Sequence, residues 1–321
     1  MMAYGSRDFV KLTHPTRRTV LTGALVCALN GCTSGRESDT IGTKDMTTNY
    51  RERLRGIERS AGGRLGAYVL DTSNGRSFGW RENERFAHAS SFKLSLAAMV
   101  LALDERGTID LGEILHWTES DMMWVSPVTR ANIATGLSMR ELAWATLVTS
   151  DNTAANVLLR RLGGPETLTA FWRSTGDEIS RLDMYEPELN VVPPGTTLNS
   201  TTPMAMGNTL ARLMTGKVLS VENTATLSDW MAQVRTGMDR IRAGFPDDWV
   251  AGDKTGTGIG DDVHTYVDIA FGAPEGRLPL IVTAYFEPAN LVEPMDPVSV
   301  RALSDVGRLA FRSISSRGTG M

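Results

Sequence analysis

The sequence predicts a mixed α/β protein of the α+β type, with one antiparallel sheet built from both ends of the chain, flanking helices and an inserted all-helical subdomain. Three observations predict it. A strand–turn–strand pattern lies near the start, helical periodicity fills about residues 88–232, and β-rich segments return afterwards. With 321 residues, of which 41% are hydrophobic and 22% charged, the chain can bury a large core in one or two lobes.

The first strands of the sheet follow a helix. Residues 50–62, YRERLRGIERSAG, carry apolar and charged residues at helical spacing and end near a Gly-Gly stop. Residues 64–80, RLGAYVLDTSNGRSFGW, then give two short strands around Ser-Asn-Gly. That tripeptide between apolar runs is a hairpin signal.

The middle of the chain is mostly helical, and strands return after it. Runs such as SMRELAWATLVTS and NTAANVLLRRLGG have helical spacing and a Ser or Gly near their ends. The later segments DWVAGDKTG, HTYVDIAFGAP and PLIVTAYFEP are rich in β-forming residues and bounded by Gly, Pro or Asp. PVSVRALSDVGRLAFRSI predicts a closing helix. A groove between the resulting two lobes is the expected place for a site.

The first 32 residues are expected to be an export signal rather than part of the fold. Arg17-Arg18 suits the twin-arginine route, and the apolar run that follows, residues 20–29, is too short to span a bilayer. The run ends in Leu-Asn-Gly-Cys, which is similar to a bacterial lipoprotein box and predicts lipidation at Cys32. A plain signal peptide cut near the same place is the alternative. We therefore expect an exported protein, either periplasmic or anchored to the membrane by its N-terminal lipid.

Residues 33–46 are small and polar, and they predict a flexible linker before a catalytic domain over residues 47–315. Both cysteines, Cys27 and Cys32, precede this domain, so it has no disulfide and no cysteine metal site. The four histidines form no HxH or HExxH pair, which argues against a zinc hydrolase. We expect no metal or cofactor. The net charge of −4 gives no sign of a nucleic-acid-binding protein.

A serine and a lysine share one face at the start of an apolar helix. In AHASSFKLSLAAMV, residues 87–100, Ser90 and Lys93 stand three residues apart. A serine hydroxyl needs a base to become a nucleophile, and a partly desolvated lysine amine can serve. The alternative is that Ser90 or Ser91 caps the helix and Lys93 points to water.

Two further triplets make the serine–lysine pair more specific. Ser150-Asp151-Asn152 stands between two helical runs, and Lys254-Thr255-Gly256 ends a strand. Either could alone be a helix cap or a strand end. Each triplet is expected by chance in only about a few per cent of chains of this size, so both of them after Ser-x-x-Lys form a strong joint signal.

With these three motifs in this order, the chain resembles the class A serine β-lactamases over about residues 50–315. The segment RLDMYEPELN, residues 181–190, is similar to the Ω-loop of that family, with Glu186 and Asn190 in the matching positions. Penicillin-binding transpeptidases share the three motifs but lack this glutamate. The alternative for Glu186 is a solvated loop carboxylate.

The resemblance implies a role for each motif in the hydrolysis of penicillins and cephalosporins. Ser90 attacks the lactam carbonyl, and either Lys93 or Glu186, through a water, takes its proton. Ser150 passes a proton to the departing nitrogen, and Glu186 activates the water that cleaves the acyl-enzyme. The substrate-binding residues implied in the same way are Asn152, Asn190, Lys254, Thr255, Thr257 and Arg240. The backbone N–H groups of residues 90 and 257 would form the oxyanion hole.

Two other functions remain open on the sequence. A cell-wall DD-peptidase would use the same serine chemistry, but Glu186 argues against it, because a long-lived acyl-enzyme has no use for a water-activating base. A non-catalytic protein that binds lactams or peptidoglycan would not need all of the reactive groups. Family members usually act as monomers, so we expect a monomer whose partners are small-molecule β-lactams.

Some positions depart from the family pattern. Met184 and Asn199 stand where an Arg/Asp ion pair often ties the Ω-loop, which predicts a looser loop. Ala89 and Gly258 cannot form the disulfide usual in class A carbapenemases, so efficient carbapenem hydrolysis is not expected. Where the family often has an aromatic gate the chain has Val125, preceded by Trp124. That tryptophan either replaces the gate or packs in the core.

Overall fold

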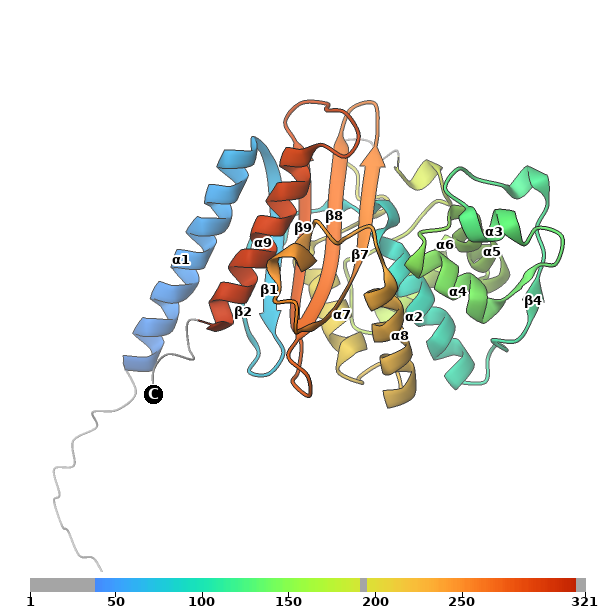
Figure 1. Cartoon of the computed structure of the whole chain (residues 1–321), viewed down its shortest axis with the longest axis horizontal. Coiled ribbons are helices and arrows are strands. Elements are labelled where there is room, and N and C mark those ends of the chain that lie inside the picture. Colours follow the sequence, from blue (N-terminus) through green and yellow to red (C-terminus); the bar gives the residue numbers. More distant parts are fainter. Residues whose placement is uncertain (1–37, 191–194, 316–321) are drawn as a thin grey trace, which may run out of the picture. The chain divides into compact units, whose positions relative to one another are not determined.

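The computed structural model describes residues 38–190 and 195–315, and its centre is a five-stranded antiparallel sheet (Figure 1). The strand order is β2-β1-β9-β8-β7. The strands are β1 (Gly63–Asp71), β2 (Arg76–Trp80), β7 (Val250–Ile259), β8 (His264–Ala273) and β9 (Leu280–Pro288). The first long strand pairs with the last, with Ala67 opposite Ala284, so the sheet is built from both ends of the chain as predicted.

The β1–β2 hairpin turns where the sequence predicts it. Asp71 accepts hydrogen bonds from the backbone N–H of Ser73 at 3.0 Å and of Gly75 at 2.9 Å, the first through its side chain and the second through its carbonyl. Gly75 has a φ of +73°, a left-handed conformation that costs glycine little. Local turn chemistry therefore fixes this register.

Helices α1 (Ser38–Ala61) and α9 (Pro297–Ser315) cover one face of the sheet. Leu54 of α1, Val282 of β9 and Leu303 of α9 belong to one buried apolar cluster. Because side chains alternate between the faces of a strand, neighbouring residues such as Ile281 join a second cluster on the other face, with the remaining large helices. The sheet thus separates two cores.

Helix α1 is longer than the sequence indicates. It begins at Ser38, so residues 38–46, predicted to be linker, are helical, whereas residues 33–37 and the predicted signal lie outside the described residues. Extending a helix from its end fixes one residue per new hydrogen bond, which is far less costly than starting one. The composition of residues 38–46 does not reveal that they extend the helix that follows them. In the described residues no helix is both long and apolar enough to cross a membrane.

The inserted part is mostly helical, as predicted. Its helices are α2 (Phe92–Glu105), α3 (Pro127–Ala131), α4 (Met139–Val148), α5 (Asn152–Leu162), α6 (Pro165–Ser174), α7 (Pro203–Met214) and α8 (Val221–Gln233). Short strand pairs not foreseen from the sequence interrupt it: β3 (Phe86–Ala87) with β6 (Ser200–Thr201), and β4 (Ile114–Leu115) with β5 (Leu137–Ser138). Short 3-10 turns complete it, namely η1 (Ala89–Ser91), η2 (Glu119–Asp121) and η3 (Glu188–Asn190), and η4 (Ile241–Gly244) follows.

The two lobes meet where β7 touches the turn before α2. A Cβ built on Gly256 would lie 3.0 Å from the carbonyl oxygen of His88 and 3.1 Å from the backbone nitrogen of Ser90. Only a glycine allows the strand and the turn to approach this closely without displacement. The Lys-Thr-Gly and Ser-x-x-Lys motifs are thereby brought side by side.

Candidate active site

The Ser90 hydroxyl lies against a buried amine. Ser90 is in η1, immediately before α2, and the Nζ of Lys93 donates a hydrogen bond to its Oγ at 3.0 Å. The Lys93 side chain is fully buried, and burial lowers its pKa, although the Glu186 carboxylate opposes that shift. Ser91 makes no side-chain capping bond. The alternative of a capping serine with a solvent-facing lysine is therefore wrong.

The Lys93 amine contacts α5, the turn before it and the Ω-loop as well as Ser90. Its Nζ lies 2.9 Å from the carbonyl oxygen of Ser150, contacts the Oδ1 of Asn152, and lies 3.2 Å from the Oε1 of Glu186. Ser150 has a φ of +59°, a conformation that is strained for a residue with a Cβ. The turn between α4 and α5 thus aims both a carbonyl and a hydroxyl at the amine.

Glu186 faces the same hydroxyl from the Ω-loop. Its side chain is buried, with Oε1 at 3.5 Å from the Oγ of Ser90 and Oε2 accepting a hydrogen bond from Asn190 at 2.7 Å. The solvated-carboxylate alternative is wrong. The loop is held here by Asn156 of α5, which accepts from the backbone N–H of Glu186 at 3.0 Å and donates to its carbonyl at 2.8 Å. Asn156 was not predicted as a site residue from the sequence, although it stands one helical turn after Asn152.

Ser150 also faces a second lysine, from β7. The Nζ of Lys254 donates to the Oγ of Ser150 at 3.1 Å, and Lys93 lies 3.4 Å from the same oxygen. Burial, assisted by the positive charge of Lys93, lowers the pKa of Lys254 to about 7. Two amines with lowered affinity for protons therefore flank one hydroxyl.

The hydroxyls of Thr255 and Thr257 on β7 are each held by a hydrogen bond to a neighbouring side chain. Thr255 shares a 2.6 Å hydrogen bond with Thr236, a residue the sequence analysis did not single out. Arg240, expected as a further cation for the substrate, is almost fully buried. Its guanidinium donates to the carbonyl of Gly256 at 2.9 Å and to the Oγ1 of Thr257 at 2.8 Å. Arg240 therefore acts on the site through its hydrogen bond to Thr257 and does not line the open surface of the site.

Asp151, the middle residue of the Ser-Asp-Asn motif, fixes the start of α5. It is fully buried as the N-cap, accepting the backbone N–H of Ala154 at 2.8 Å. Its other oxygen accepts the backbone N–H groups of Val128 and Thr129, at 3.0 and 2.9 Å. The carboxylate thus joins α3 to α5, so the residues on either side of it have fixed positions.

The rim of the site carries an exposed indole. The carbonyls of Trp124 and Val125 accept hydrogen bonds from Asn152, at 2.9 Å to its side chain and 3.0 Å to its backbone. The Trp124 side chain is 67% exposed, so it does not pack in the core. Val125 has a φ of +56°, which is rare for a β-branched residue.

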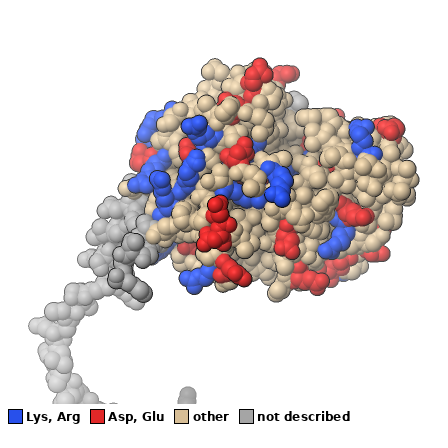
Figure 2. All heavy atoms as spheres, viewed as in Figure 1, with Lys and Arg blue, Asp and Glu red and all other residues tan. Residues whose placement is uncertain are grey.

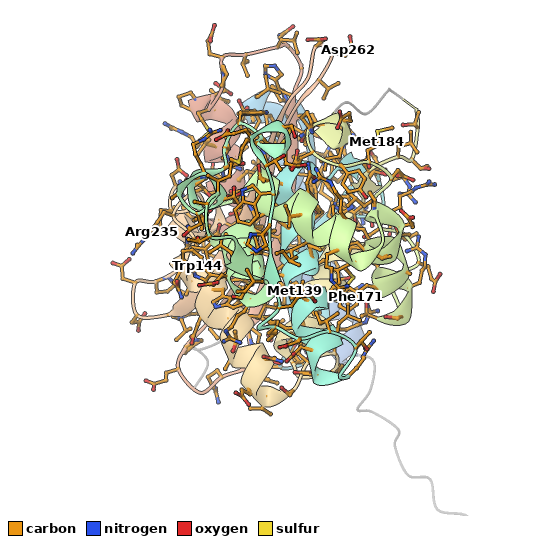
Figure 3. All side chains as sticks on the ribbon, turned by 90° about the vertical axis from the view of Figure 1, so that its right-hand side faces the viewer. Met139, Trp144, Phe171, Met184, Arg235 and Asp262 are labelled. Carbon is orange, nitrogen blue, oxygen red and sulfur yellow. The ribbon has the colours of Figure 1, made fainter. Side chains whose placement is uncertain are left out.

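The neck of the Ω-loop is tied despite the absent ion pair. The Oδ1 of Asn199 accepts the backbone N–H groups of Asp183 and Met184, at 2.8 and 3.1 Å. Asp183 in turn accepts the N–H of Asn199 at 2.8 Å and pairs with Arg181. Figure 3 shows the Ω-loop, labelled at Met184, in the same upper part of the view as the β7–β8 turn, labelled at Asp262. An amide therefore stands in for the missing ion pair at the neck, and the looser loop stays a prediction.

Comparisons with known proteins agree with this geometry. Residues 49–314 match the model of the Beta-lactamase enzyme family. The chain is 41% identical to a β-lactamase of Streptomyces fradiae over 84% of this chain and 88% of that protein, and 42% identical to β-lactamase CTX-M-8 of Citrobacter amalonaticus over 75% and 82%.

Solved structures of class A β-lactamases are also similar to this chain, in both sequence and fold. An ancestral class A β-lactamase, GNCA, superposes with a TM-score of 0.77 at 44% identity, over 82% of this chain and 99% of that one. A second reconstruction, GNCA4 of the last common ancestor of Gram-negative bacteria, gives a TM-score of 0.77 at 43% identity, over 83% and 99%. The chain belongs to the class A β-lactamases.

Proposed function

We propose that this enzyme hydrolyses penicillins and cephalosporins through an acyl-enzyme on Ser90. One observation carries the proposal. The Ser90 Oγ has two potential bases within reach, the Lys93 amine at 3.0 Å and the Glu186 carboxylate at 3.5 Å. A single hydroxyl placed between a buried amine and a buried carboxylate suits both formation and hydrolysis of an ester.

In acylation the Ser90 oxygen attacks the lactam carbonyl carbon. Its proton passes to the Lys93 amine or, through a water, to Glu186. The carbon–nitrogen bond of the ring then breaks as Ser150 donates its proton to the departing nitrogen. The proton taken from Ser90 returns to the Ser150 oxygen through Lys93, 3.4 Å away, while Lys254, 3.1 Å from the same oxygen, stabilises its charge during the transfer. The backbone N–H groups of residues 90 and 257 stabilise the oxyanion, and losing one such donor typically costs about 100- to 1000-fold in rate.

In deacylation a water held by Glu186 and Asn190 attacks the ester. Glu186 takes a proton from this water, the bond between the carbonyl carbon and the Ser90 oxygen breaks, and that oxygen regains a proton. Asn190 donates to the Glu186 oxygen that points away from Ser90, which keeps the carboxylate oriented. This step distinguishes a hydrolase from a protein that only traps lactams.

The substrate is held by groups of opposite charge and by an amide. Lys254, with the hydroxyls of Thr255 and Thr257, suits the carboxylate of the antibiotic. Arg240 adds positive charge behind Thr257. Asn152 is placed to bind the side-chain amide of the substrate. The exposed Trp124 next to it provides an apolar surface for that side chain.

A chromogenic cephalosporin tests the proposal. Sustained turnover that is lost in Ser90→Ala is the expected result. A single burst of colour without further turnover would overturn it in favour of a DD-peptidase or a lactam-binding protein. Burst amplitude equal to the enzyme concentration would show that acylation, but not deacylation, is intact.

We further propose that the enzyme is exported and anchored by a lipid on Cys32. The Arg17-Arg18 pair and the Leu-Asn-Gly-Cys sequence support this. In a lipoprotein-processing host, labelled palmitate should enter the wild-type protein and not Cys32→Ala. Equal release of both proteins into the soluble fraction would contradict anchoring.

A further inference from the structure

The outward faces of α1 and α9 are rich in arginine. Figure 2 shows basic side chains gathered on the part of the surface where these two helices lie. Among the residues whose side chains the structure describes, the exposed or half-buried charges on the two helices are mostly basic. The basic ones are Arg51, Arg53, Arg55, Arg59, Arg301, Arg308 and Arg312, and the acidic ones are Glu52 and Asp305. We call this surface the α1–α9 face.

The charge of the α1–α9 face is opposite to that of the domain. Of the 33 basic and 37 acidic residues of the chain, residues 1–48 hold six and four, which leaves 27 basic and 33 acidic residues in residues 49–321. The domain is therefore net acidic, while this face has an excess of arginine. Such a separation of charge orients a protein in an external field.

Several of these arginines have no acidic partner. Among the described residues, Arg53, Arg59, Arg301 and Arg312 make no ion pair, whereas Arg51 reaches Glu82 only at 3.5 Å. Exposed pairs of that length contribute little and are readily exchanged. The four unpaired guanidinium groups are therefore available to an external anion.

The helices that carry these arginines form a fixed platform. Leu54 and Leu303 anchor them in the buried cluster on one face of the sheet. The guanidinium groups of Arg51 and Arg55 stand 5.7 and 5.8 Å from the ring of Trp80, and that of Arg53 stands 5.8 Å from a tyrosine ring. Guanidinium groups held near aromatic rings lose less freedom when they bind.

We propose that the α1–α9 face lies against the anionic lipid surface of the membrane to which the chain is anchored. The choice of a membrane as partner rests on the proposed lipid at Cys32. That residue is 17 positions before Asn49, so even a fully extended connection keeps the face within roughly 60 Å of the bilayer. One acyl chain gives marginal binding, and a basic surface is the usual second signal.

This orientation leaves the active site open. Ser90 and Lys93 belong to the lobe on the other face of the sheet, whose core is separate from that beneath α1 and α9. The sheet therefore stands between the membrane and the catalytic groups. Binding through the α1–α9 face brings the enzyme to the surface without covering its substrate entrance.

Vesicle binding by the chain that begins at residue 33 tests the proposal without the lipid. Solved relatives that consist almost entirely of the matching domain show that this part folds alone. We expect it to co-sediment with phosphatidylcholine vesicles containing about 30% phosphatidylglycerol and not with pure phosphatidylcholine, since each basic residue adds about a fivefold preference. Raising the salt from about 20 mM to about 300 mM should release it.

Two matched variants, each losing four positive charges, decide the outcome. Replacing Arg53, Arg59, Arg301 and Arg312 by Gln should weaken binding by at least about tenfold. Replacing the exposed Arg106, Arg130, Arg140 and Arg277 by Gln should change it by less than about threefold. Turnover of a chromogenic cephalosporin should be unchanged in both, which separates this proposal from the proposed function.

Three results would overturn the proposal. These are absence of binding to the anionic vesicles, equal loss in the two variants, and binding to soluble polyphosphate but not to vesicles. The last result would identify an anionic polymer as the partner instead.

Discussion

At the scale of single residues, the proposed mechanism uses Glu186 differently in the two half-reactions. It is 3.5 Å from the nucleophile and is held by Asn190 and Asn156. Glu186→Ala removes the base for the attacking water, while Lys93 remains to activate Ser90. We expect steady-state turnover to fall by about 100- to 10,000-fold and the acyl-enzyme to accumulate, visible by intact-protein mass spectrometry. Clearance of the adduct at the wild-type rate would contradict this role.

His88, two residues before the nucleophile, predicts a dependence of stability on pH. Its ring is fully buried and stacks on Trp172 with centroids 4.9 Å apart. Burial lowers the pKa of His88 from 6.5 to about 4, while the carboxylates of Asp177 and Asp183 oppose the shift and Arg85 reinforces it.

As the pH drops, His88 is therefore protonated in the unfolded chain before it is protonated in the folded one. The free energy of unfolding falls as a result between about pH 6.5 and pH 4. The loss from this residue is at most about 3 kcal/mol. Urea unfolding at both pH values measures it, and His88→Phe, which keeps the stacking but cannot titrate, should flatten the dependence. Parallel pH curves for the two proteins would show that other groups are responsible.

At the scale of elements, the Ω-loop depends on one amide at its neck. Asn199 accepts two backbone N–H groups, and in Asn199→Ala these half-buried donors lose their partner. We expect a loss of about 2 kcal/mol in the free energy of unfolding and slower deacylation, because Glu186 moves with the loop. Thr197→Ala, at an exposed position two residues earlier, loses a single 3.4 Å hydrogen bond from Arg181 and is the control. Unchanged deacylation in Asn199→Ala would mean that the loop is held elsewhere.

The elements also show which parts of the site can be predicted from sequence. The hairpin at Ser73-Asn74-Gly75 was predicted because its signal is local. The motif residues Ser90, Lys93, Ser150, Glu186 and Lys254 were predicted as a set and converge. The roles of Asn156 and of Asn199 at the neck of the Ω-loop were missed, because they depend on contacts between segments distant in sequence. The helical start of α1 was missed because its composition resembles that of a linker.

At the scale of the whole molecule, we expect catalysis to depend on how closely the lobes meet at Gly256. A Cβ there would approach the Ser90 backbone nitrogen at 3.1 Å, so Gly256→Ala must displace the nucleophile turn by a few tenths of an ångström. We expect a roughly tenfold loss in kcat/KM. Gly258→Ala, whose Cβ would meet Ala89 at an ordinary 3.5 Å, should stay near the wild-type value. Equal activity of the two variants would show that the turn carrying Ser90 can move by this amount without loss of catalysis.

The pairing of β1 with β9 has a consequence for synthesis of the protein. Ala67 finds its partner only when Ala284 has been made, so the central sheet cannot close while the ribosome is still working through the helical lobe. Contacts this remote in sequence form slowly, and until then the β1 edge is free to pair with other chains. A copy terminated before residue 250 would lack β7, β8 and β9, three of the five strands. β-Lactamase activity therefore requires nearly every codon of the domain to be translated, and partial products must be removed by quality control without having contributed any activity.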